Sequence, residues 1–145
     1  MASETLDQDI ATRLHAADQR FTKGRRRLVA VLGNGDGPMT IQQILDSDER
    51  LAQSSVYRNL AILEQVGAVT RIVTRDDFAR YELAEDLTEH HHHLICSACG
   101  DVRDFSLTPT VEHDLEQALR KVAQRSRFQE EAHRLDLVGV CSDCH

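Results

Sequence analysis

The sequence predicts an α+β protein with an N-terminal winged helix-turn-helix domain and a small α/β C-terminal dimerisation domain that contains a four-cysteine zinc site. Helical patterns followed by a β-hairpin fill residues 1–83, and two Cys-x-x-Cys pairs bracket most of residues 90–145. Residues 84–89 read as a polar hinge linker between them. A chain of 145 residues is long enough for two small domains.

The first two helices are predicted from periodicity and from turn residues. Residues 5–20 carry apolar side chains at near-helical spacing, namely Leu6, Ile10, Leu14 and Ala17. Thr22 has the side chain of an N-cap, so a second helix is expected from there to about Leu32. It should end at residues 33–38 (Gly-Asn-Gly-Asp-Gly-Pro), the strongest turn signal in the chain.

Two further helices and a hairpin complete the N-terminal domain. Thr40 caps a short helix, and a longer helix is expected over 53–66, with Ser54 or Ser55 near its N-cap and Gly67 at its C′ position.

The β-rich runs 68–74 and 78–83, separated by Arg75-Asp76-Asp77, predict a hairpin. This order is the layout of a winged helix-turn-helix, and it places the helix around Tyr57 in the recognition position.

The C-terminal domain is predicted to mix strands and one helix. Strands are expected over His93–Cys96 and Val102–Phe105, a helix from Pro109 to about Arg125, and a last strand over Arg134–Val140. A module this small leaves sheet edges and apolar surface exposed, and dimerisation is the usual remedy.

Charge is distributed unevenly within a formal net charge of −7. Residues 1–83 hold 11 Lys/Arg against 12 Asp/Glu, whereas residues 84–145 hold 6 against 12. The basic residues cluster early in the chain, at Lys23, Arg25, Arg26 and Arg27, with Arg20 just upstream. A local basic face can bind nucleic-acid phosphates, and the acidic half suits cations.

The remaining composition argues against a membrane protein and a secreted protein. Apolar runs stay well below the roughly 20 residues of a membrane span. The first residues, Met-Ala-Ser-Glu, lack the basic and apolar regions of a signal peptide, so we expect a cytoplasmic protein.

The four cysteines predict a structural zinc site. Cys96 and Cys99 form one Cys-x-x-Cys step, and Cys141 and Cys144 form another. Each step lets two thiolates reach one ion, and two steps complete a tetrahedral sulfur shell. A redox motif would need a βαβ setting that the sequence lacks, and two pairs of matching spacing favour one shared ion over disulfides.

Four consecutive histidines lead into the first cysteine pair. On a strand they alternate between faces, so His91 and His93 point one way and His90 and His92 the other. Two separate cation sites can therefore be built from one segment. Imidazole with carboxylate suits Zn²⁺, Fe²⁺, Mn²⁺, Co²⁺ or Ni²⁺. A purification tag would be terminal, and a merely polar run has no reason to adjoin a cysteine pair.

Several motifs resemble the ferric uptake regulator (Fur) family of dimeric, metal-dependent transcriptional repressors. The resemblance extends over nearly the whole chain from about residue 12. The matching segments are Ser55-Val56-Tyr57-Arg58-Asn59-Leu60, Tyr81-Glu82-Leu83, the run from His90 to Gly100, and His133 ahead of Cys141-Ser-Asp-Cys144.

The resemblance implies three metal positions in a regulator that is not an enzyme. They are a structural zinc site at Cys96, Cys99, Cys141 and Cys144, a regulatory hinge site at Glu82, His91, His93 and Asp104, and a third site at His90, His92, Glu112 and His133. It also implies a double-stranded DNA operator bound by a homodimer. The expected DNA contacts are Lys23, Arg25, Arg26, Ser55, Tyr57 and Arg58.

The regulatory ion stays open between Zn²⁺ and Fe²⁺. Pro38 stands where iron- and peroxide-sensing members commonly have a histidine, and Ala84 stands where zinc-sensing members often have a cysteine. His92, where iron regulators often have a carboxylate, favours zinc slightly. The alternatives are an iron-based peroxide-sensing repressor of the same family, or a small zinc hydrolase, for which the chain offers neither an HExxH helix nor an evident nucleophile.

Overall fold

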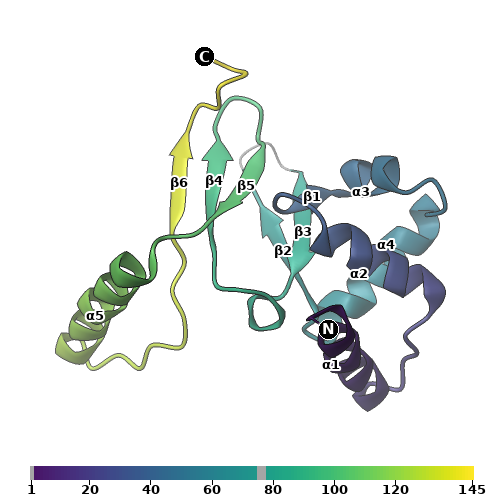
Figure 1. Cartoon of the computed structure of the whole chain (residues 1–145), viewed down its shortest axis with the longest axis horizontal. Coiled ribbons are helices and arrows are strands. Elements are labelled where there is room, and N and C mark those ends of the chain that lie inside the picture. The colour runs from purple at the N-terminus through teal and green to yellow at the C-terminus, as the bar shows by residue number, and fades with distance from the viewer. Residues whose placement is uncertain (1, 75–77) are drawn as a thin grey trace.

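The computed structural model describes residues 2–74 and 78–145, which form two sheet-containing units (Figure 1). The first contains α1 (Ala2–Ala16), α2 (Lys23–Gly33), β1 (Met39–Thr40), α3 (Ile41–Ser47), α4 (Gln53–Gln65), β2 (Val69–Val73) and β3 (Ala79–Leu83). The second contains β4 (His92–Cys96), β5 (Val102–Phe105), α5 (Pro109–Arg125) and β6 (Asp136–Gly139). A 3₁₀ turn, Glu85–Leu87, lies between them.

Helix boundaries follow the local signals closely. The Thr22 side chain accepts a hydrogen bond from Arg25 N, and Thr40 forms a reciprocal capping box with Gln43. Gly67 has a φ of 77°, the left-handed conformation expected just after a helix. Ser54 and Ser55 lie near the N-cap of α4 as expected, in its first turn, but the N-cap itself is Ala52, whose methyl group cannot accept a hydrogen bond.

The N-terminal sheet has the order β1-β3-β2, and its neighbouring strands are antiparallel. The β2–β3 hairpin confirms the predicted pairing of these two runs, whereas its turn at residues 75–77 lies outside the described residues. The third strand was not predicted, because β1 is only two residues long and is defined by its pairing with Tyr81 and Arg80 rather than by its own composition.

A single apolar core supports the first unit. It joins side chains from α1 through β3, including Ile10, Leu14, Leu28, Leu60 and Leu63, all at most 1% exposed. At about 1.5–3 kcal/mol for each fully buried large aliphatic side chain, such a core can stabilise a domain of this size.

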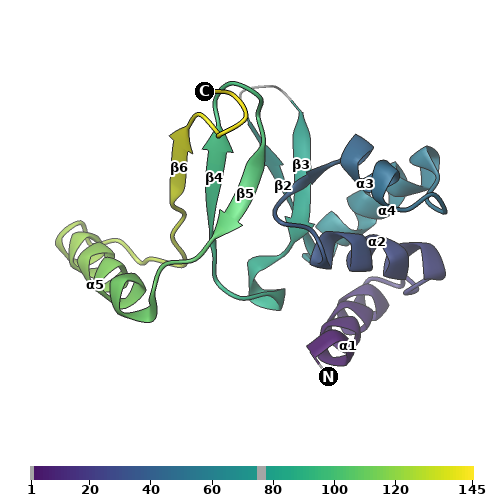
Figure 2. The same cartoon turned by 45° about the horizontal axis from the view of Figure 1, so that its top comes forward.

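The second unit has much less buried apolar surface. Its sheet has the order β5-β4-β6, with β4 antiparallel to β5 and parallel to β6. Among the described residues from 90 onward, the buried hydrophobic side chains are Cys96, Val102 and Ala123. Figures 1 and 2 show α5 beyond the end of this sheet, at the opposite end of the molecule from α1–α4. No helix along residues 2–74 and 78–145 is long and apolar enough to cross a membrane.

Candidate metal centres and nucleic-acid interface

Three clusters of metal-ligating side chains lie in or beside the C-terminal unit, and they coincide with the three predicted sets. In each cluster one donor atom per residue lies within 4.8 Å of the others. The clusters are Cys96, Cys99, Cys141 and Cys144; Glu82, His91, His93 and Asp104; and His90, His92, Glu112 and His133.

The cysteine cluster has the dimensions of a tetrahedral zinc site. The Sγ atoms of Cys99 and Cys141 are 3.8 Å apart. Sulfur ligands at about 2.3 Å from a central zinc ion are separated by about 3.8 Å in a tetrahedron. None of the four cysteines, all of which the structure describes, forms a disulfide. The residues therefore fit a zinc ion that joins the C-terminal end of the chain to the turn after β4.

Backbone amides prepare one of these thiols for ionisation. Cys141 N and Cys99 N lie 3.3 and 3.5 Å from Cys96 Sγ, and these N–H donors lower the pKa of Cys96 to about 6. Hydrogen bonding to the crowded Cys141 thiol instead raises the pKa of Cys144 to about 12. Several ionised thiols this close together would repel one another. A bound dication neutralises this repulsion, so the four cysteines suit a metal ion better than free thiolates.

The second cluster, here called the hinge site, draws its ligands from both units. Glu82 on β3 belongs to the N-terminal unit, and its Oε2 lies 3.0 Å from His91 Nε2 and 3.1 Å from His93 Nε2. Asp104 Oδ1 on β5 lies 3.7 and 3.5 Å from the same nitrogens. Nitrogen and oxygen ligands at about 2.0–2.1 Å from zinc stand about 3.3–3.4 Å apart, so this spacing also fits an ion.

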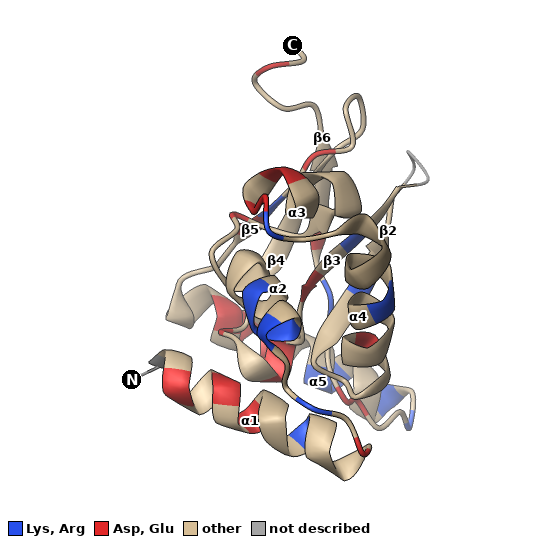
Figure 3. Ribbon diagram, turned by 90° about the vertical axis from the view of Figure 1, so that its right-hand side faces the viewer, with Lys and Arg blue, Asp and Glu red and all other residues tan. Residues whose placement is uncertain are grey.

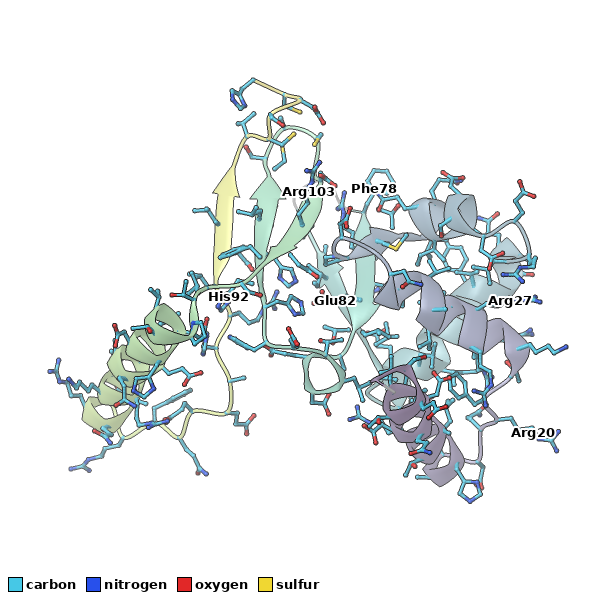
Figure 4. The ribbon with its side chains drawn as sticks, in the orientation of Figure 1. Arg20, Arg27, Phe78, Glu82, His92 and Arg103 are labelled. Carbon is cyan, nitrogen blue, oxygen red and sulfur yellow. The ribbon has the colours of Figure 1, made fainter. Side chains whose placement is uncertain are left out.

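Charge at the hinge site is organised around Glu82. Burial alone would raise the pKa of Glu82, but hydrogen bonds and charge from His93 and His91 outweigh it and lower that pKa. In return, the hydrogen bond to Glu82 raises the pKa of His93. Burial raises the pKa of Asp104. In Figure 4, Glu82 on β3 lies on the α1–α4 side of the labelled His92.

The third cluster links β4 to α5 and to the loop after it. Glu112 on α5 lies at its centre: Oε1 is 2.9 Å from His90 Nε2 and 2.9 Å from His133 Nε2, and Oε2 is 2.8 Å from His92 Nε2. A hydrogen bond to His92 lowers the pKa of Glu112 and keeps it anionic. Figure 4 shows His92 on the α5 side, opposite Glu82, as the alternation of faces predicted.

One ring nitrogen in this cluster is left without a partner. Among the described residues, the Nδ1 atom of His92 is the buried side-chain polar atom that lacks a hydrogen bond, and His92 is only 1% exposed. The other nitrogen of this ring, Nε2, faces Glu112 and the shared donor cluster.

The residues predicted to contact DNA occupy different environments. Tyr57 on α4 is 55% exposed, and Lys23, Arg26 and Arg58 are exposed, whereas Ser55 is half-buried. Figure 3 shows basic residues on α2 and α4 and acidic residues along α1. The exposed side chains are thus available to a duplex.

Arg25 differs from the other predicted phosphate contacts because it is buried. Its Nε donates to Asn59 Oδ1 at 3.0 Å, and its NH1 group donates to the Arg20 carbonyl at 2.6 Å. Its guanidinium therefore fastens α2 to α4 and is not offered to solvent. The sequence could not reveal this, because the burial depends on how the two helices pack.

Other polar groups next to the sites were not predicted from the sequence. Asp136 on β6 lies 3.7 Å from His93 Nδ1, Glu85 pairs with His90, and Arg13 of α1 pairs with Asp86. The Asp136 and Arg13 contacts join segments distant in the chain, and isolated acidic or basic residues carry no local signal of such a partner. Glu85 and His90 are only five positions apart.

Comparison with known proteins identifies similar chains. A family model, the ferric uptake regulator family, matches residues 16–138. The ferric uptake regulation protein of Campylobacter upsaliensis is 29% identical over 156 residues, covering 100% of this chain and 96% of the relative. The peroxide-responsive repressor PerR of Staphylococcus aureus is 27% identical over 143 residues, covering 96% and 90%. The structure of the Helicobacter pylori ferric uptake regulator Fur, which reveals three functional metal binding sites, has a TM-score of 0.77 at 25% identity and covers 98% of this chain and 93% of that chain.

Proposed function

The chain belongs to the ferric uptake regulator family, and we propose that it binds a palindromic DNA operator as a homodimer when the hinge site holds Zn²⁺ or Fe²⁺, thereby repressing metal-uptake genes. Members of this family are metal-responsive transcriptional regulators. Mn²⁺, Co²⁺ and Ni²⁺ also suit the nitrogen and oxygen donors of the hinge site. With chromosomal DNA as its partner, the protein would act in the cytoplasm.

The observation that carries the proposal is the convergence of ligands from two units at the hinge site. Glu82 comes from the sheet that supports α4, while His91, His93 and Asp104 come from the other sheet. A bound dication would join these two sets of ligands and so favour one relative placement of the two units.

The units of this proposal are residues 1–83 for DNA binding, 84–89 for the hinge, and 90–145 for dimerisation and metal binding. Shifting such a hinge from mostly open to mostly closed takes about 5 kcal/mol of differential binding, which a site with four protein ligands can supply. In a dimer, the closed placement would set the distance between two α4 helices. That distance must match successive major grooves, one helical turn apart on a palindrome.

The side chains of α2 and α4 supply the DNA contacts in this proposal. Exposed Lys23, Arg26 and Arg58 would meet phosphates, giving most of the affinity and a strong dependence on salt. Tyr57 can pack on thymine methyl groups, and half-buried Ser55 can reach the backbone at the start of α4. Arg25 holds α2 against α4 through Asn59 and acts by positioning these contacts.

Exposed apolar surface supports the homodimer. On α5 and in the loop that follows, Val111, Val122 and Phe128 are 50%, 58% and 68% exposed. On β6, Leu137 and Val138 are 61% and 54% exposed. Exposed apolar side chains gathered on one small unit favour an interface, and a second copy would also cover the free edge of β6.

The other two clusters have supporting roles in the proposal. The four cysteines hold a structural Zn²⁺, because four protein ligands close its coordination shell. The third cluster ties α5 to β4 through Glu112. Closed shells of this kind argue for binding, and against a hydrolase that would need an open coordination position.

Peroxide sensing is the second candidate, favoured by the 27% identity to the staphylococcal PerR over 96% of this chain. In such a sensor, oxidation of an iron-ligating histidine would release DNA. The histidines of the hinge site make this reaction open to test.

The test is operator binding by the full-length protein, followed by fluorescence anisotropy. A duplex selected from a random pool would be titrated with the wild type or with one of two variants. Each titration would be run under anaerobic conditions with Zn²⁺ or Fe²⁺ present. We expect Glu82→Gln to lose the metal dependence of DNA binding, whereas Glu89→Gln, an exposed neighbour whose carboxylate lies outside all three clusters, should keep it. Full metal dependence in the Glu82 variant would refute the hinge assignment. Loss of DNA binding after peroxide treatment of the Fe²⁺ form alone would instead support the peroxide sensor.

A further inference from the structure

The loop between α2 and β1 lies against β5, across the seam between the two units. Asp104 N on β5 donates a hydrogen bond to the Asp36 carbonyl, with a donor–acceptor distance of 3.0 Å. Figures 1 and 2 show this loop reaching from α2 toward β5. The contact therefore joins the N-terminal unit to the C-terminal unit without using a side chain.

Gly37 makes this close approach possible. A Cβ atom at Gly37 would lie 2.6 Å from Val102 O and 2.9 Å from Arg103 Cα, both backbone atoms of β5. Backbone atoms of a paired strand cannot turn aside as a flexible side chain can. The described glycines with positive φ are Gly67 and Gly100, so what Gly37 supplies is space and not an unusual backbone conformation.

Asp104 belongs to two groups of residues that span the same seam. Its N–H holds the loop, and its carboxylate belongs to the hinge site together with Glu82. On one side of the seam, β1 follows the loop directly and pairs with Tyr81, the neighbour of Glu82. On the other side, Asp104 pairs with His93 in the β4–β5 ladder. The two contacts are therefore carried by the same two sheets.

We propose that the loop at Asp36 and Gly37 is a latch that docks on β5 and that raises the affinity of the hinge site for its ion, with Gly37 as a positioning residue that is not a ligand. Two contacts carried by the same two bodies must favour each other, because each one holds the partners of the other in place. Docking of the loop lowers the conformational freedom that the ion would otherwise have to remove. This inference rests on the proposed role of the hinge site.

The matched pair of variants is Gly37→Ala and Gly33→Ala. A methyl group at Gly33, the last residue of α2, would lie 3.6 Å from Leu83 Cδ1, an ordinary van der Waals distance. The two variants make the same chemical change in one short segment, and only the first would separate the loop from β5.

The experiment measures ion affinity and DNA binding separately in the full-length protein with its cysteine site filled by zinc. Zn²⁺ would be titrated into the hinge site against a chelator of known affinity. We expect Gly37→Ala to weaken Zn²⁺ binding by about 5- to 150-fold, the range typical of coupling between linked sites. Gly33→Ala should stay within about threefold of the wild type, and operator binding should need correspondingly more Zn²⁺ only in the Gly37 variant.

Thermal unfolding before Zn²⁺ is added to the hinge site checks that the variants fold. We expect similar midpoints for both, because neither glycine has a positive φ that would strain alanine, and because undocking the loop from β5 leaves the apolar core of the first unit intact. Unchanged Zn²⁺ affinity in Gly37→Ala would overturn the latch, as would a lower midpoint with unchanged affinity, which would assign Gly37 to folding alone. A third outcome separates the two proposals. If Gly37→Ala weakens Zn²⁺ binding but operator binding by the wild type does not depend on Zn²⁺, the latch is supported and the regulatory role of the hinge site is refuted.

Discussion

Replacing Cys144 by serine tests whether the cysteine site holds the end of the chain in place. The parallel ladder between β6 and β4 joins four residue pairs. Ordering residues 136–145 costs about 10–20 kcal/mol, at about 1–2 kcal/mol per residue for the backbone. The ladder returns on the order of 4 kcal/mol, at about 1 kcal/mol net per hydrogen bond. The exposed side chains of Leu137 and Val138 add little burial within one chain.

A structural zinc ion has the right strength to make up this difference. Such ions contribute about 10–16 kcal/mol of apparent binding free energy at neutral pH. Serine is a poor zinc ligand, so we expect Cys144→Ser to release the ion and to free β6 from β4. Ser142→Ala, between the two cysteines of the same pair, is the matched control and should keep both.

Hydrogen exchange read by mass spectrometry measures the result, with zinc content determined on the same samples. Amides of β6 should lose their protection in the cysteine variant, while those of α4 should keep theirs because the N-terminal core does not depend on the ion. Protected β6 amides in a variant shown to lack zinc would refute this reasoning, since packing alone would then hold the strand.

Four other variants test single contacts. Tyr57→Ala should change the free energy of unfolding by less than about 0.5 kcal/mol, since the ring is 55% exposed. The same variant should weaken operator binding by about 5- to 150-fold in anisotropy titrations. Unchanged affinity would remove Tyr57 from the interface. Arg25→Ala should destabilise the protein in urea by about 1–3 kcal/mol, because Asn59 loses its buried donor. Lys23→Ala, at an exposed position, should leave the free energy of unfolding unchanged and lower the salt slope of DNA binding by about 1. A stable Arg25 variant with a lowered salt slope would contradict the structural role of Arg25. His133→Ala should bind one ion fewer per chain in elemental analysis with the cysteine zinc retained, and an unchanged ion count would argue against the third site.

Much of the N-terminal fold could be predicted because its signals are local. Thr22 and Thr40 cap helices by bonding to residues three positions later, and Gly67 ends α4 through its own backbone conformation. A strand of two residues has no such signal. Met39 and Thr40 become β1 only because β3 lies beside them, so periodicity could not reveal it.

The candidate site was predictable in part for the same reason. The spacing of the cysteines and the alternation of the histidines are properties of short segments, and both predict which side chains share a face. Glu112 and Asp104 come from distant segments, and their partnership with the histidines was implied only by the family resemblance. Arg25 shows the opposite limit: its charge predicted an exposed phosphate contact, but the packing of α2 against α4 buries it.

Each unit is stabilised internally by a different kind of interaction, and this difference explains how a metal ion can act as a signal. Burial of apolar side chains from α1 through β3 stabilises the N-terminal unit, which contains both α4 and Glu82. The C-terminal unit buries few apolar side chains among its described residues, and three clusters of metal-ligating side chains lie in or beside it. In the proposed mechanism its geometry would depend on the ions bound, while the geometry of the DNA-reading surface would not. An ion at the hinge site would then move the preformed DNA-binding surface of α2 and α4 without altering it, which is the property that a reversible, metal-dependent regulator requires.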